Sequence, residues 1–173
     1  MEVRIAKIED VPEMIRLWEI MQTAHLGYDL RFYALTDRRH YIAAATSYIS
    51  ALVDDPAAVC VVCLDGERIV GSLVAKIEKK PPVYTGVTVA SIDHVVVDET
   101  FRRRGVFRML FARLEAEAKA RGVDSIECFV DCDNQAASAY RAVGMVSRQL
   151  RMVKHMKDSP NHAPANGCGR LSR

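Results

Sequence analysis

The chain of 173 residues is long enough for one ordinary globular domain, because a chain of this size buries roughly two thirds of the surface that it exposes when unfolded. Half of the residues are apolar and 27% are charged, which excludes the disordered and fibrous classes. The formal net charge is only +2, so no overall field favours nucleic acid or an anionic membrane as a partner.

The first fifty residues predict a strand and two helices. Residues 3–6 alternate in character as a strand does, without the long apolar stretch of an export signal or membrane segment. Asp10 followed by Glu13 resembles a capping box, and apolar residues at helical spacing then predict a helix over about 10–25. A second helix is predicted over about 37–53.

The middle of the chain predicts three strands. Two β-branched runs, 59–64 and 68–77, are joined by Asp65-Gly66, a pair typical of tight hairpins. A third run over 87–97 ends in three consecutive valines, which indicates burial on both faces of a sheet.

The last third predicts two more helices and two more strands. Apolar residues at helical spacing indicate a helix over about 107–122, followed by a strand over 125–131. A short helix over 136–143 and a long final strand over 145–156 complete one mixed α+β domain, residues 1–157. Residues 158–173 are rich in Pro, Gly, Asn and Ser and predict a flexible tail.

Five cysteines, an odd number in a chain without a signal peptide, favour a reduced cytoplasmic setting. Cys60 and Cys63 have the spacing of a metal pair, but in a strand their side chains point to opposite faces, so we interpret them as core thiols. The histidines form no ligand set with one another, and the sequence predicts no metal site.

A basic turn stands between the third predicted strand and the third helix. Arg102, Arg103 and Arg104 precede Gly105, and Arg108 follows within the first helical turn. The free N–H groups and the positive dipole of a helix start favour an anion, and the arginines suit a pyrophosphate. Taken alone, the arginine run is equally well explained as a solvated surface.

Here the chain resembles the GNAT superfamily of N-acetyltransferases. The coenzyme A loop of that superfamily has Arg or Gln, two residues, Gly, one residue, then Gly or Ala, and a V-x-V pair comes before it. Arg102, Gly105 and Phe107 fill the loop places, and Val95 and Val97 form the pair. Phe107 departs from the pattern: its bulk either narrows the approach to the phosphates or turns inward to the core.

The resemblance covers residues 3–156 and implies a GNAT-like α+β domain, with a twisted, mostly antiparallel sheet of six to seven strands flanked by four helices. It also implies acetyl-CoA as acyl donor, with strand backbone holding the pantetheine arm and loop N–H groups holding the pyrophosphate. The implied cofactor-binding residues are Val95, Val96, Val97, Arg102, Arg103, Arg104, Gly105, Val106, Phe107, Arg108 and Asn134.

Residues 131–145 resemble the later cofactor-contacting helix of the superfamily, with Asn134, Tyr140 and Gly144 as counterparts. The spacing from Asn134 to Tyr140 is one residue shorter than usual, so Asp133 is an alternative for the Asn place, and Met145 replaces the usual Phe. The resemblance makes Tyr140 the acid that protonates the departing thiolate, a task suited to a phenol of pKa about 10. The alternative is that Tyr140 only packs in the core.

An amine must lose a proton before it attacks a thioester, and Asp93 and His94 are the candidate bases, with an ordered water as a third option. A histidine changes charge near neutral pH, whereas an aspartate better attracts a cationic amine. Strand alternation places the two on opposite faces, so only one faces the cleft unless a bulge shifts the register. The resemblance also makes the N–H of Val95 a donor to the oxyanion.

The predicted reaction is direct acetyl transfer to a primary amine of a small molecule or peptide, with no nucleic acid or membrane partner and with the option of a homodimer. The resemblance implies that the first two helices and the link over 27–35 cover the acceptor pocket, where Tyr28, Asp29, Arg31 and Tyr33 offer polar and aromatic contacts that fit many amines. Two alternatives stay open: a non-catalytic acyl-CoA sensor or interaction module, and a nucleic-acid contact through the arginine run, whose affinity would fall steeply with salt.

Overall fold

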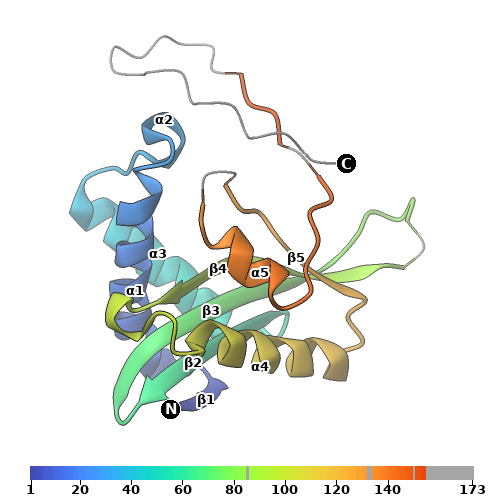
Figure 1. The fold of residues 1–173 in the computed structure, drawn as a ribbon, viewed down its shortest axis with the longest axis horizontal. Helices are drawn as coiled ribbons and strands as arrows, with labels where there is room; N and C mark the ends of the chain where they lie inside the picture. The colour runs from blue at the N-terminus through green and yellow to red at the C-terminus, as the bar shows by residue number, and fades with distance from the viewer. Residues whose placement is uncertain (85, 132–133, 150, 155–173) are drawn as a thin grey trace.

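The computed structural model describes residues 1–84, 86–131, 134–149 and 151–154. One sheet carries helices on both faces (Figure 1). In chain order the elements are β1 (Glu2–Ile5), the 3-10 helix η1 (Ile8–Asp10), α1 (Val11–His25), α2 (Leu30–Tyr33), α3 (Arg38–Val53), β2 (Ala58–Asp65), β3 (Arg68–Lys79), β4 (Thr88–Val97), the 3-10 helix η2 (Glu99–Phe101), α4 (Val106–Ala120), β5 (Ser125–Cys128) and α5 (Ala137–Arg141).

The sheet has the order β1-β2-β3-β4-β5. The first three pairings are antiparallel and β4 pairs with β5 in parallel. The mixed α+β class and the mostly antiparallel sheet are therefore confirmed. The four predicted helices correspond to α1, α3, α4 and α5, and α2 adds a single turn in the link between the first two.

The prediction of six to seven strands is wrong for the part of the chain that the structure describes, which contains five. The predicted final strand fails, because residues 145–149 and 151–154 form no regular element. Val146, Met152 and Val153 are 78%, 81% and 56% exposed, so the apolar residues of this segment are not packed on a sheet face. The rest of that predicted strand, and the tail over 158–173, lie outside the described residues.

The hairpin between β2 and β3 is confirmed. Asp65 pairs with Arg68, which leaves Gly66 and Glu67 as the two-residue loop, and Gly66 has the left-handed φ of +62°. The loop therefore lies one residue later than the Asp65-Gly66 pair suggested.

The core consists of two apolar layers on opposite faces of the sheet. Met14 and Leu17 from α1 and Ile49 from α3 fill one layer, and Leu110 and Leu114 from α4 fill the other. Figure 1 shows α4 on the near side of the sheet, with α3 behind it. Each helix is amphipathic at the spacing that the sequence displayed, which is why it docks on the sheet by one stripe.

The two cysteines of β2 are confirmed as core thiols on opposite faces. Cys60 packs in the layer of α1 and α3, and Cys63 packs in the layer of α4. Burial raises the pKa of Cys60 to about 12, so this thiol stays protonated at neutral pH.

The helix start predicted at Asp10 is confirmed, because Asp10 is the N-cap of α1, but its side chain makes no capping hydrogen bond to this helix. The Asp10 carboxylate accepts the Lys7 N–H at 2.7 Å and pairs with the Arg4 guanidinium at 2.6 Å, so it stabilises η1 and the end of β1. Glu13 pairs with Arg16 at 2.8 Å instead. A bidentate guanidinium is the stronger partner for a carboxylate, and this outcome depends on the position of Arg4.

Gly71 in β3 sets how closely the start of α4 approaches the sheet. A Cβ at this position would lie 2.7 Å from Val106 Cγ1, 3.1 Å from Leu110 Cδ1 and 3.3 Å from the Val96 carbonyl oxygen. The missing side chain therefore leaves the space that the first turns of α4 occupy.

We expect Gly71→Val to lower the free energy of unfolding by about 3 kcal/mol, because it overpacks a full interface against backbone and side chains. Urea denaturation measures this change. Ser72→Ala in the same strand is the control: Ser72 is fully buried, its hydroxyl has no partner among the described residues, and its removal should cost less than about 1 kcal/mol. Equal losses in both variants would contradict the close approach at Gly71.

Candidate active site

The turn before α4 has two left-handed residues. Gly105 is the N-cap of α4 with a φ of +83°, and Arg103 has a φ of +61°. A non-glycine residue in this region is uncommon and marks a locally constrained backbone. Alternation of left-handed and ordinary residues turns successive N–H groups toward one concave side, the geometry of an anion-binding nest.

The N–H groups of this turn are free to bind a ligand. Among the described residues, no acceptor meets the backbone N–H groups of residues 103–108. The N–H of Met109 is the first to be used within the chain, donating to the Gly105 carbonyl at 3.1 Å. The space around the Gly105 α-carbon is open, with no atom within 4 Å of where a Cβ would stand. These properties fit a diphosphate at the start of α4.

The arginines surround this turn in exposed positions. Arg102 is paired with Glu99 at 3.3 Å and its side chain is 52% exposed. Arg103, Arg104 and Arg108 are exposed as well. The Arg104 guanidinium lies 5.0 Å from the centre of the Phe101 ring, a cation–π contact that keeps its charge near the turn.

A buried carboxylate anchors the strand that leads into the turn. Asp98, at the end of β4, accepts the Thr100 N–H at 3.2 Å and pairs with Arg68 at 2.7 Å and Arg16 at 3.2 Å. Burial by itself would raise the pKa of Asp98, but the Thr100 hydrogen bonds and the two guanidinium groups outweigh it and hold that pKa below its usual value. The corner between β4 and α4 is therefore fixed by charged contacts from α1 and β3.

The end of β4 exposes backbone groups on the side away from β3. The N–H of Asp98 donates to the Val70 carbonyl of β3 at 2.9 Å, so the backbone groups of Val95 and Val97 point the other way. The pairing of β4 with β5 ends at Ile92 and Cys128, and no strand of the described chain covers β4 beyond that point. An extended amide-bearing ligand could add to this edge as a strand does.

A β-bulge places Asp93 and His94 on the same face of the sheet. Val74 pairs with His94 and the next residue, Ala75, pairs with Ile92, so Asp93 is the extra residue on β4. His94 thereby joins the face of Val74 and Val96, which α1 and α3 cover. The placement on opposite faces that simple alternation predicts is wrong, and the bulge is the reason.

Both oxygens of the Asp93 carboxylate accept hydrogen bonds from the protein. Tyr48 on α3 donates its hydroxyl to Oδ1 at 2.8 Å, and Nδ1 of His94 lies 3.0 Å from Oδ2. Burial opposes the charge, but these bonds, together with the charge of Lys76, hold the pKa of Asp93 below its usual value. Asp93 is therefore an anion at neutral pH.

Exposure separates the two candidate bases. The Asp93 side chain is 31% exposed, whereas the His94 side chain is 2% exposed and its Nε2 is buried without a partner among the described residues. Because a carboxylate only accepts, Nδ1 of His94 carries the hydrogen of the shared bond. Asp93 can meet a substrate, and His94 can act only through Asp93.

Tyr140 of α5 lies against the start of α4 and the end of β5. Its ring meets the Phe107 ring edge-on with centroids 5.2 Å apart, and Phe107 also stacks on Phe111 at 5.8 Å. The Phe107 ring therefore packs inward against the core and does not narrow the approach to the turn before α4. Burial, and then the neighbouring Cys128 thiol, raise the pKa of Tyr140, so the phenol is protonated at neutral pH.

Asn134 accepts hydrogen bonds from backbone N–H groups in the turn before α5. Its side-chain oxygen accepts the Ala136 N–H at 2.8 Å and its carbonyl accepts the Ala137 N–H at 3.1 Å. The alternative residue for this place, Asp133, lies outside the described residues. The structure thus gives Asn134 a role in the turn that precedes Tyr140.

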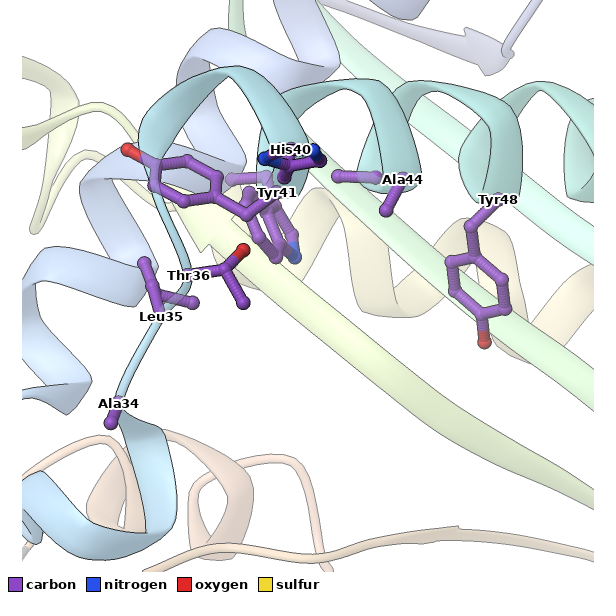
Figure 2. Close-up of a pocket in the computed structure, with 9 residues that line it drawn as sticks. Ala34, Leu35, Thr36, His40, Tyr41, Ala44 and Tyr48 are labelled. Atoms are coloured by element: carbon purple, nitrogen blue, oxygen red, sulfur yellow. The ribbon is translucent and has the colours of Figure 1, made fainter.

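An open groove of about 580 Å³ runs along α3, and Tyr48 in its lining donates to Asp93. Figure 2 shows Tyr41, Ala44 and Tyr48 along one side of α3, with Leu35 and Thr36 from the preceding link at one end. Trp18 of α1 also lines it, and the Trp18 and Tyr41 ring centres are 6.1 Å apart. We refer to this surface as the α3 groove.

Sequence reasoning missed Tyr48, Tyr41 and Trp18 as site residues. Tyr41 and Tyr48 are seven residues apart, two helical turns, so the sequence carried the signal that they share a face. It had no signal that this face meets Asp93, which is 45 residues further along the chain from Tyr48. The aromatic residues expected to contact an acceptor, Tyr28 and Tyr33, instead gather around His25, at 5.7 and 4.8 Å between ring centres.

The sheet has an antiparallel part and one parallel pairing, and a basic turn leads from β4 into α4, an arrangement that fits an acetyltransferase. The model of the Acetyltransferase (GNAT) family matches residues 15–145. The chain belongs to the GNAT family of acetyltransferases.

Solved structures show the same fold. A mutant of the BH1408 protein from Bacillus halodurans is 25% identical, with a TM-score of 0.81 over 91% of this chain and 100% of that one. A ribosomal-protein-alanine N-acetyltransferase from Brucella melitensis biovar Abortus is 17% identical, with a TM-score of 0.66 over 90% and 99%. An aminoglycoside acetyltransferase from an uncultured soil sample is 18% identical, with a TM-score of 0.65 over 91% and 96%. No curated protein matches the chain.

Within the described residues, no helix is both long and apolar enough to cross a membrane. The same part of the chain holds no group of three His, Cys, Asp or Glu side chains placed to bind a metal ion.

Proposed function

We propose that this acetyltransferase moves an acetyl group from acetyl-CoA directly to a primary amine, without a covalent enzyme intermediate. The observation that carries the proposal is the turn before α4, where six successive N–H groups, residues 103–108, have no acceptor among the described residues. A dense positive charge surrounds the same turn. Few ligands other than a diphosphate need so many donors at a helix start.

The chain would hold acetyl-CoA in two places. Residues 103–108 would donate N–H groups to the pyrophosphate, with Arg102 and its neighbours adding charge. Val95 and Val97 would hydrogen-bond the amide groups of the pantetheine arm through the free edge of β4, as an added strand would. Bound acetyl-CoA supplies a thioester, whose carbonyl carbon accepts a nucleophile.

Asp93 and Tyr140 would then manage the protons. Asp93 attracts the cationic amine and takes one proton from it, through water where needed, so that the neutral nitrogen can form the new N–C bond. The nitrogen loses its second proton after the attack, which replaces the proton that Tyr140 gives up. Tyr140 gives its proton to the sulfur as the C–S bond breaks, so that a neutral thiol leaves. The N–H of Val95 donates to the carbonyl oxygen while negative charge develops there.

His94 is a positioning residue in this proposal. It is buried and holds Oδ2 of Asp93, so it orients the base without touching the amine. The three cysteines that the structure describes do not supply a nucleophile: Cys60 and Cys63 lie in the core, and burial raises the pKa of Cys128 to about 11. Direct attack by the amine is the route that remains with these residues.

The acceptor is an amine of a small molecule or of a peptide. Two proteins of similar fold are named for such acceptors, ribosomal-protein alanine in one and aminoglycosides in the other. The fold alone therefore does not select one acceptor, and the residues around Asp93 decide which amine binds.

Release of free thiol from acetyl-CoA, measured with a panel of primary amines and peptides, tests the proposal. We expect release that depends on the amine, and the Tyr140→Phe variant should lower kcat roughly tenfold or more while keeping the Phe107 contact and the Kd for acetyl-CoA. Tight binding of acetyl-CoA without turnover for any amine would favour a sensor. Unchanged kcat in Tyr140→Phe would remove Tyr140 as the acid.

A further inference from the structure

We propose that the α3 groove binds the apolar, ring-bearing part of the acceptor, so that the substrate is a primary amine on an aromatic or alicyclic body. This inference rests on the acetyl transfer proposed above and names its acceptor class. It follows from the composition of the groove, from where its polar atoms are directed, and from the carboxylate beside it.

The surface of the groove is mainly apolar. Trp18, Leu35, Tyr41, Ala44 and Tyr48 line this open groove of about 580 Å³, together with the polar residues Thr36 and His40. Ala44 and Ala45 have small side chains, so the surface of α3 between Tyr41 and Tyr48 leaves space for a ligand. A flat hydrocarbon ring can lie against such a wall and gain contact with the aromatic side chains.

Both tyrosine hydroxyl groups of the lining, and one side of the His40 ring, are already paired within the protein. The Tyr41 hydroxyl donates to Glu19 at 3.0 Å, and the Tyr48 hydroxyl donates to Asp93 at 2.8 Å. The His40 ring is engaged by the Asp37 carboxylate. A sugar-like amine would lose its water in this groove and find few new partners apart from Thr36 and His40, and each hydroxyl left unpaired costs free energy.

The charge beside the groove suits an ammonium group. Tyr48 lines the groove and touches Asp93, whose side chain is partly exposed and anionic. The Lys76 ammonium lies 4.7 Å from the centre of the Tyr48 ring and also acts on Asp93, so a substrate ammonium would share this carboxylate with one resident cation. An amine whose ring lies along α3 would place its nitrogen toward Asp93, two residues before Val95 and the free edge of β4.

Trp18 offers a readout of binding that does not depend on catalysis. It is the only tryptophan in the chain and it lines the groove. With excitation selective for tryptophan, we expect 2-phenylethylamine to change the emission of the protein saturably, in the absence of acetyl-CoA. Glucosamine, a primary amine of similar size with a hydroxylated ring, should need at least a tenfold higher concentration.

Two substitutions on α3 test the location. Ala44→Phe fills the groove and should weaken 2-phenylethylamine binding at least tenfold, without adding a tryptophan. Ala43→Phe is the matched control, because Ala43 is exposed on the same helix and does not line the groove. The control should bind 2-phenylethylamine as the unsubstituted protein does.

Turnover separates failure of this inference from failure of the proposed reaction. We expect kcat/KM for 2-phenylethylamine at least tenfold above that for glucosamine, a difference of about 1.4 kcal/mol. If 2-phenylethylamine binds the groove but no thiol is released, the groove binds the proposed class of amine and the acetyl transfer proposal is contradicted. Thiol release with no response of Trp18, or with equal kcat/KM for both amines, would overturn the groove assignment and leave acetyl transfer standing.

Discussion

Gly105→Glu is expected to raise the Kd for acetyl-CoA by about two orders of magnitude or more, because it sets a carboxylate beside the proposed diphosphate site. The left-handed φ of +83° adds strain of about 1–2 kcal/mol to folding, and the open space around the α-carbon accepts the new side chain without collision. The protein should therefore fold with modestly reduced stability. Isothermal titration with acetyl-CoA measures the loss, and thermal unfolding measures the cost to the fold.

Gly122→Glu is the matched control for that experiment. Gly122 follows the other end of α4, also has a left-handed φ, +66°, and also has open space around its α-carbon. The two variants therefore share the charge change and the backbone strain and differ in the end of the helix that they touch. Equal affinities for acetyl-CoA in both variants would show that the start of α4 does not bind the diphosphate.

Asp93→Asn is expected to lower kcat/KM for the amine by about 100-fold, because the amide neither attracts an ammonium group nor takes its proton. The Kd for acetyl-CoA should stay within a factor of about two, since Asp93 is not among the groups proposed to hold it. Steady-state kinetics and titration with acetyl-CoA measure the two quantities separately. A loss of less than about threefold in kcat/KM would mean that Asp93 is not the base.

Tyr48→Phe tests the same carboxylate through its pH dependence. The variant keeps the ring and removes the hydrogen bond that stabilises the charged form of Asp93, so the pKa of Asp93 should rise. The acidic limb of the kcat/KM profile should then move to higher pH, because Asp93 becomes protonated earlier as the pH falls. If the acidic limb of the profile stays at the same pH while kcat/KM falls, the Tyr48 hydroxyl does not set the pKa of Asp93, and Tyr48 only shapes the site.

The bulge at Asp93 and the failed final strand show the limit of periodicity as a guide. Strand alternation gave the correct face for Val95, Val96 and Val97 relative to one another, but one extra residue moved His94 to the other side of the sheet. The alternating pattern after residue 145 predicted a strand that the described residues do not form. In both cases the deciding interactions come from neighbouring strands and helices, and a local pattern does not contain them.

The sequence by itself determined the class of the domain, the four main helices, the five strands that formed among those predicted, and the basic turn with its glycine, because each depends on periodicity or on local backbone chemistry. Only the tertiary structure decided which residues meet at the site. Tyr48 reaches Asp93 from a helix 45 residues earlier, and His94 lies beneath it because of the bulge. Such contacts depend on how helices dock on a sheet, and docking is set by the packing of the whole core rather than by the order of residues within one segment.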